Sequence, residues 1–239
     1  MEIARVEGYR KFCNKLWNAT KFCLFRMDLV TLEGKRQESS FVPNKTGLVC
    51  LIVSLSRSLF NEQPTGQESV VEKWLFHKLN IAAAAVNEKL ESRDFSEASS
   101  AAYSFFLYDL CDVFIEATKP LFEANVDSPE KLSAQNTLYT ALEGGLKLLH
   151  PFMPFVTEDL WQRLPRRPED DCESIMISSF PERLSEMDFP QEAADFEMVI
   201  ETIKAARSIV GLYNLPTNGK TLEDKISGES PFSSHQDLC

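Results

Sequence analysis

Apolar residues recur at steps of three and four along most of this chain, the spacing of an α-helix that buries one side. Such runs cover residues 5–27, 68–90, 94–119, 128–149 and 191–213, and a shorter one covers 157–161. Two begin with recognisable start signals: Asp94 stands three residues before Glu97, and Ser128 directly precedes Pro129. The sequence therefore predicts an all-α fold, an antiparallel helical bundle, up to Pro216.

The same spacing predicts which side chains face the core. In the first run we expect one inward stripe, made of Tyr9, Phe12, Cys13, Leu16, Thr20, Cys23 and Met27. In the run over 94–119 we expect another, made of Tyr103, Phe106, Leu110, Val113, Phe114 and Ala117. Each tryptophan lies in or beside an apolar stripe, so we expect core positions for Trp17, Trp74 and Trp161. Pro120 should end or kink its helix near Lys119, since proline lacks the backbone N–H.

The chain divides into three parts on composition and pattern. Residues 1–165 form the predicted bundle, interrupted at 28–66 by an atypical loop or insert whose apolar stretch, 47–60, lacks clean periodicity. Residues 166–216 hold one short extended segment, at 174–178, and the helix that follows it. Residues 217–239 are polar and contain Ser and Gly, so we predict a disordered tail.

Composition excludes several classes of protein. The six cysteines are scattered without a CxxC motif and the three histidines are far apart, so neither a zinc site nor a disulfide scaffold is expected. The longest apolar run, 47–55, is too short to cross a membrane, and no signal peptide is recognisable at the start. We therefore expect a soluble, cytoplasmic protein without a membrane partner.

The first helix differs in charge from the rest of the chain. Residues 1–27 hold six Lys/Arg against two Asp/Glu, whereas the whole chain has a net charge of −11. Lys11, Lys15, Asn18 and Phe22 follow one another at steps of four, three and four, along a face that the core does not need. Ammonium groups contact phosphates, an amide can contact a base edge, and a ring can stack on an unpaired base. A solvated face with one stray aromatic is the alternative, but the local positive charge favours an anionic partner.

No catalytic motif is found. Phosphate-binding glycine loops and the G-x-S-x-G elbow are both missing from the sequence. Asp109, Asp112 and Glu116 share a helix face, but no histidine stands beside them, so we interpret them as solvated or paired with basic groups. A second basic cluster, Arg163, Arg166 and Arg167, is followed at once by acidic residues 169–171, which favours a salt-bridged turn over a phosphate clamp.

Three blocks of the sequence resemble, in family order, the anticodon-binding helical domain of valyl-tRNA synthetases, which are class I aminoacyl-tRNA synthetases. They are RVEGYRKFCNKLWNATKF at 5–22, LYDLCDVFIEATKP at 107–120 and LLHPFMPFVTEDLWQRLPRR at 148–167. ESIMISSFPE at 173–182 and IKAARSIVGLYNLP at 203–216 are similar to the segments beyond them.

The resemblance implies that the first helix meets the anticodon stem-loop of valine tRNA and contributes recognition to valyl-tRNA aminoacylation. Four residues match positions associated with anticodon contact: Arg5, Lys15, Asn18 and Phe22. Three more suit backbone contact by charge and face, namely Arg10, Lys11 and Lys21. The full-length family uses ATP and Mg²⁺, but its nucleotide fold and editing domain lie upstream of this segment. We therefore expect no cofactor, no metal and no catalytic activity in this chain alone.

Two alternatives to tRNA binding remain open from the sequence. The net charge of −11 also suits an acidic helical module that docks a protein partner. The chain could instead be a nonfunctional truncated product. DNA is not an expected partner in any of these interpretations.

Overall fold

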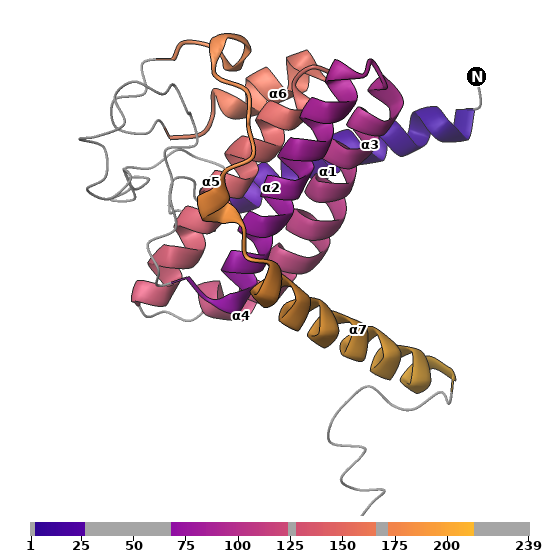
Figure 1. The fold of residues 1–239 in the computed structure, drawn as a ribbon, viewed down its shortest axis with the longest axis vertical. Coiled ribbons are helices and arrows are strands. Elements are labelled where there is room, and N and C mark those ends of the chain that lie inside the picture. Colours follow the sequence, from indigo (N-terminus) through magenta and orange to yellow (C-terminus); the bar gives the residue numbers. More distant parts are fainter. Residues whose placement is uncertain (1–2, 27–67, 124–127, 166–171, 213–239) are drawn as a thin grey trace, which may run out of the picture. The chain divides into compact units, whose positions relative to one another are not determined.

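The computed structural model describes residues 3–26, 68–123, 128–165 and 172–212, and every part of the chain that it describes lacks β-strands. Its helices confirm the all-α prediction (Figure 1). The predicted insert at 28–66 and the predicted tail at 217–239 lie outside the described residues. The chain splits into two compact units, Met1–Ala193 and Ala194–Cys239.

The first unit holds the helices that position the candidate site. They are α1 (Ile3–Arg26), α2 (Val70–Glu91), α3 (Phe95–Ser104), the π-helical stretch η1 (Phe105–Phe114), α4 (Ile115–Glu123), α5 (Pro129–Leu149) and α6 (Pro154–Trp161). Two 3-10 turns follow, η2 (Ile175–Ile177) and η3 (Ser185–Met187). The last helix, α7 (Pro190–Leu212), begins at the end of this unit and continues into the second.

The start signals act as predicted. The Asp94 side chain accepts a hydrogen bond from the Glu97 N–H at 3.1 Å, and the Ser128 hydroxyl accepts one from the Lys131 N–H at 3.2 Å. Ser69 caps α2 in a full capping box with Glu72, a third helix start in addition to the two predicted ones. Each cap satisfies N–H groups that have no partner inside the helix, which is why these residues mark the helix ends.

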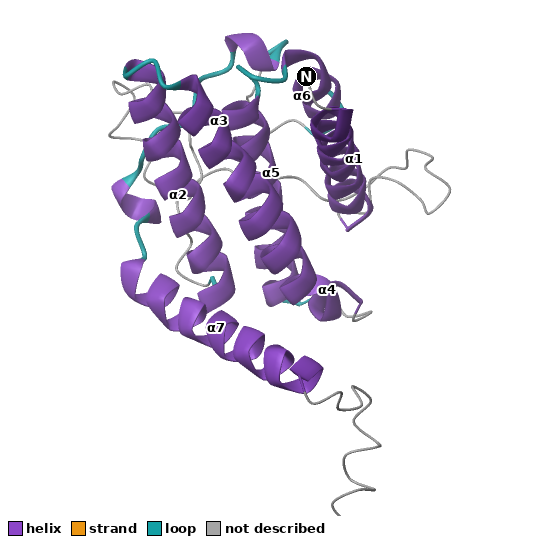
Figure 2. Ribbon diagram, turned by 90° about the vertical axis from the view of Figure 1, so that its right-hand side faces the viewer, coloured by secondary structure: helices purple, strands orange, loops and turns teal. Residues whose placement is uncertain are grey.

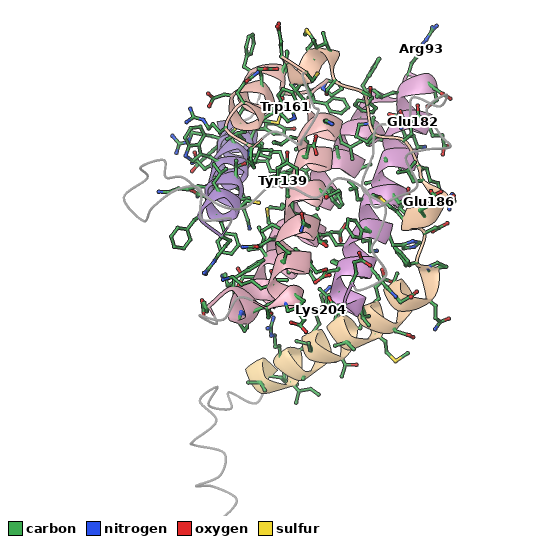
Figure 3. The ribbon with its side chains drawn as sticks, turned by 90° about the vertical axis from the view of Figure 1, so that its left-hand side faces the viewer. Arg93, Tyr139, Trp161, Glu182, Glu186 and Lys204 are labelled. Carbon is green, nitrogen blue, oxygen red and sulfur yellow. The ribbon has the colours of Figure 1, made fainter. Side chains whose placement is uncertain are left out.

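The core lies where α5 is surrounded by α1, α2, α3, η1, α4 and α6 (Figure 2). Trp74 on α2 and Trp161 on α6 are buried in it, as predicted. Figure 3 labels Trp161 and Tyr139; the Tyr139 hydroxyl donates to the Pro165 carbonyl at 2.6 Å, which ties α5 to the end of the α6 segment. The bundle is therefore built around one central helix.

Pro120 does not end its helix, contrary to one expectation: α4 continues through it to Glu123. Phe122 is buried beyond the proline, and its carbonyl accepts a hydrogen bond from Arg26 Nη1 at 3.3 Å. Tertiary contacts thus retain the turn that proline disfavours. The preceding η1 was not predicted, and its wider turn rotates the following residues, so Ala117 is exposed rather than inward.

The extended segment expected at 174–178 is wrong in its centre. Ile175–Ile177 form a 3-10 turn, and only the flanking Ser174 and Ser178 have extended backbone. The cause is local: the Ser174 hydroxyl accepts from the Met176 N–H at 3.2 Å, and a Glu158 carboxylate oxygen accepts from the Ile175 N–H at 3.1 Å. These side-chain partners replace the neighbouring strand that extended backbone would need.

Candidate nucleic-acid interface

The inward side of α1 fixes which of its side chains remain outside. Leu16, Thr20 and Cys23 are fully buried, and Phe12 packs on Tyr103 with ring centroids 4.5 Å apart. The prediction holds for these four residues of the inward stripe. Of the other three, Tyr9 is 67% exposed, Cys13 is partly buried and Met27 lies outside the described residues.

The outward row that the sequence predicts, which we call the Lys15 row, consists of Lys11, Lys15, Asn18 and Phe22. Its first three side chains are exposed, as predicted. Two of them are engaged within the chain. Lys11 lies 3.5 Å from the Glu7 carboxylate, one turn earlier on the same helix. Lys15 is the more tightly held.

Lys15 Nζ donates a hydrogen bond to Asp112 Oδ1 at 2.7 Å. This hydrogen bond is the main reason that the pKa of Lys15 is raised above its usual value, so the ammonium stays charged throughout the physiological range. Asp112 lies on η1, and Glu116 pairs with Lys119 at 2.6 Å. The interpretation of these carboxylates as partners of basic groups is confirmed for both. No cluster of three potential metal ligands occurs in the described ranges.

Phe22 is half-buried rather than free on the outward face. Its ring meets Phe122 edge-on with centroids 6.3 Å apart, and the Arg26 guanidinium lies 5.0 Å from its centroid. Gln135 on α5 in turn donates to the Arg26 carbonyl at 2.6 Å. The surroundings therefore hold the Phe22 ring in one orientation and leave only part of it accessible.

A second outward row follows the first at a shift of one residue. We call it the Trp17 row; it consists of Arg10, Asn14, Trp17 and Lys21, all of them exposed. Within the part of the chain that the structure describes, Arg10 and Lys21 have no carboxylate within ion-pair distance. No carboxylate among the described residues therefore competes with an external anion for either cation.

Trp17 was expected in the core, and that expectation is wrong: 43% of the residue is exposed. The Arg163 guanidinium lies 4.8 Å from the centroid of its ring, at cation–π distance. Arg163 itself donates three hydrogen bonds to the Asp159 carboxylate, from Nη2 at 3.0 and 3.2 Å and from Nε at 3.3 Å. The sequence does carry a signal for this position, because Trp17 follows Asn14 by three residues and precedes Lys21 by four, on a polar face of the helix.

The remaining predicted residues are placed only in part. Arg5 lies in the first turn of α1, where the structure describes the backbone alone. Of the second basic cluster, Arg163 pairs with Asp159, one turn before it. The other members of that cluster, and acidic residues 169–171, lie outside the described residues. The described candidate surface is thus the outward side of α1 together with Arg163.

Comparison with known proteins finds tRNA ligases as relatives over most of the chain. A family model described as the anticodon-binding domain of tRNA ligase matches residues 72–226. The valine–tRNA ligase of Schizosaccharomyces pombe is 46% identical over 212 residues, which cover 88% of this chain and 19% of that protein. The human valine–tRNA ligase is 41% identical over 217 residues, covering 90% of this chain and 15% of that protein.

The family model begins after α1, but an alignment with a third relative includes that helix. The mitochondrial valine–tRNA ligase of Saccharomyces cerevisiae is 40% identical over 237 residues, which is 99% of this chain and 19% of that protein. The chain thus spans about a fifth or less of the length of these relatives. Among the described helices, none is both long and apolar enough to cross a membrane.

Proposed function

Because this chain belongs to the family of anticodon-binding domains of tRNA ligases, we propose that the outward side of α1 binds the anticodon stem-loop of valine tRNA. The observation that carries the proposal is the exposed group of Arg10, Lys11, Lys15, Asn18 and Lys21 on one helix of a chain whose net charge is −11. On an acidic molecule, such a concentration of cations favours a polyanion at that place and disfavours it elsewhere.

Each residue has a role suited to its chemistry. Arg10, Lys11, Lys15 and Lys21 contact phosphates, and Arg5 adds a further cation near the start of the helix. Phosphate contacts orient the RNA without reading its sequence. The Asn18 amide donates to and accepts from one base edge, and the accessible part of Phe22 stacks on an unpaired base.

The domain contributes recognition to a valine–tRNA ligase reaction, in line with the names of its relatives. ATP and Mg²⁺ act in the nucleotide fold of the full-length family, so the chain itself uses neither. We place the protein in the cytoplasm, although relatives include a mitochondrial enzyme. An ATP–pyrophosphate exchange assay of the 239-residue chain, with valine present, tests whether the chain uses ATP. Any exchange above background contradicts the proposal that it does not.

The binding test compares cognate valine tRNA with the same tRNA carrying a swapped anticodon, at two salt concentrations. Three or four phosphate contacts give a slope of about −3 in log K against log salt, so a fourfold rise in salt should weaken binding by roughly 60-fold. The cognate tRNA should bind more tightly at both concentrations. Equal affinity for the two tRNAs would refute anticodon recognition.

Variants separate the two kinds of contact. Lys15→Ala should weaken binding to both tRNAs alike, whereas Asn18→Ala or Phe22→Ala should remove the preference for the cognate anticodon. Lys89→Ala is the matched control, since Lys89 on α2 also pairs with a carboxylate, that of Glu97 at 3.0 Å. It should leave both affinities unchanged.

A second candidate function is docking of a protein partner through the acidic surface, which the net charge of −11 favours. A pull-down distinguishes the two. Protein captured equally with and without RNase, together with an absence of tRNA, supports the docking module. Recovery of tRNA that RNase abolishes supports the proposed function.

A further inference from the structure

We infer that Trp17 and Arg163 form a stacking platform for an unpaired RNA nucleotide, with Arg10 and Lys21 binding its flanking phosphates. This inference rests on the proposed function and adds a base-binding position to it. Trp17 lies outside the Lys15 row, and hydrophobicity alone would assign it to the core. The exposed 43% of the residue is what makes it available.

The ring is held in place before any ligand arrives. The Arg163 guanidinium lies 4.8 Å from the ring centroid, and its three hydrogen bonds to Asp159 orient the guanidinium in turn. An indole that is already oriented loses little rotamer freedom when a base stacks on it. A planar cation against the same ring adds a second surface that stacks on bases.

The phosphate contacts lie at suitable places on the same helix. Lys21 follows Trp17 by one turn, about 6 Å along the axis, and Arg10 precedes it by two turns, about 10 Å. Asn14 stands between Arg10 and Trp17 as an exposed amide. Cations therefore flank the ring on both sides, as they must to hold the phosphates before and after one stacked nucleotide.

The Lys15 row and the Trp17 row differ in how many of their side chains already contact other residues of the chain. Lys11 pairs with Glu7, Lys15 pairs with Asp112, and Phe22 is half-buried against Phe122. In the described structure, by contrast, Arg10 and Lys21 have no carboxylate partner, and the Trp17 ring retains an accessible part. The Trp17 row therefore binds RNA without first breaking an internal ion pair.

The test measures affinity of the 239-residue chain for two RNAs by fluorescence titration. One is an anticodon stem-loop of valine tRNA with 2-aminopurine in the loop, and the other is a paired duplex of equal phosphate number. Trp17→Ala should weaken stem-loop binding about tenfold and leave duplex binding unchanged, because stacking needs an unpaired base. Trp17→Phe should restore most of the affinity. Phe95→Ala, at an exposed aromatic on α3, should change neither.

The outcomes separate this inference from the proposed function. If Trp17→Ala leaves stem-loop affinity unchanged while Lys15→Ala lowers it, the platform is refuted and anticodon-loop binding stands. If Trp17→Ala weakens both RNAs equally, the ring is not stacking on a base, and the inference also fails. If the wild-type chain binds neither RNA, the proposed function itself is wrong. Thermal melts of each variant show whether the fold is retained.

Discussion

The helices α1 and α5 lie side by side in the bundle but are used in opposite ways (Figure 2). In α5, 14 of the 21 residues are buried, on nearly every side of the helix. In α1, buried residues form a stripe on one side, and cations, amides and one indole occupy the rest. In a helix enclosed by its neighbours, most residues are needed for packing. A helix at the edge of the bundle has a solvent-exposed side, where polar and charged residues reduce stability little.

The largest expected effect breaks the packing of α5. Leu146→Ala should lower the free energy of unfolding by about 3 kcal/mol, because Leu146 is fully buried and its removal leaves a cavity. Asn18→Ala on the outward side of α1 should change it by less than about 0.5 kcal/mol. Urea denaturation of both variants measures the difference. Similar losses in the two would mean that the outward side of α1 is part of the core.

Two glycines sharpen the same comparison. A Cβ added at Gly145 on α5 would lie 3.0 Å from Phe106 Cδ2 and 3.3 Å from Phe105 Cε1, whereas one at Gly8 on α1 would have nothing within 4 Å. Gly145→Ala should therefore destabilise the protein by about 1–2 kcal/mol through overpacking. Gly8→Ala should stabilise it by up to about 1 kcal/mol through helix propensity. Thermal melts provide the test, and shifts of equal sign would contradict it.

The ion pair on α1 offers a smaller effect, on binding rather than stability. Asp112→Asn releases Lys15, so affinity for valine tRNA should rise about threefold, the scale of an exposed ion pair. Glu116→Gln is the control, since Glu116 pairs with Lys119 and not with α1. Filter binding at low salt measures both. A loss of affinity in Asp112→Asn would show that the pair positions Lys15 for the RNA.

The Glu72 carboxyl on α2, which is hydrogen-bonded to Ser133 on α5, should make the stability of the protein depend on pH. Burial raises the pKa of Glu72 on α2, against opposing hydrogen bonds that include one from the Ser133 hydroxyl of α5, at 2.6 Å. A carboxyl whose pKa is raised by folding stabilises the protein below its unfolded pKa and loses that contribution as pH rises through the folded value. Glu72→Gln should therefore gain stability relative to wild type as pH rises above about 4.5.

Urea denaturation at pH 4 and at pH 7 checks this prediction. Glutamine keeps an acceptor for the capping box, so the cap itself should survive the substitution. Glu97→Gln, at an exposed carboxyl on α3, is the control for a substitution of Glu by Gln, with stability again compared with that of wild type. A stability of Glu72→Gln that falls relative to wild type as pH rises would contradict the assignment.

Local signals predicted most of the fold. The caps at Asp94 and Ser128 act within three residues of themselves, so sequence alone located those helix starts. The sequence did not predict the π-helical stretch η1, because an extra residue per turn does not produce a recognisable pattern within a run of mostly apolar residues. Continuation past Pro120 also depended on a distant group, the Arg26 side chain, which bonds to the Phe122 carbonyl.

For the candidate site, too, the sequence placed some residues correctly and others wrongly. Periodicity correctly put Lys11, Lys15 and Asn18 outward, since three- and four-residue steps define a helix face wherever the helix lies. Periodicity misplaced Tyr9, because it does not say where the neighbouring helices end, whereas hydrophobicity misplaced Trp17 against the spacing of its row. Hydrophobic side chains beyond that limit have nothing to pack against.

By itself, then, the sequence determined most of the helices of this protein and the Lys15 row along α1, because helix spacing and capping are properties of short segments. Only the tertiary structure decided which of those groups remain available. Lys15 meets Asp112 across 97 positions of sequence, and Trp17 meets Arg163 only because the end of α6 packs beside α1. Such pairings depend on how whole helices pack, and no local pattern encodes them.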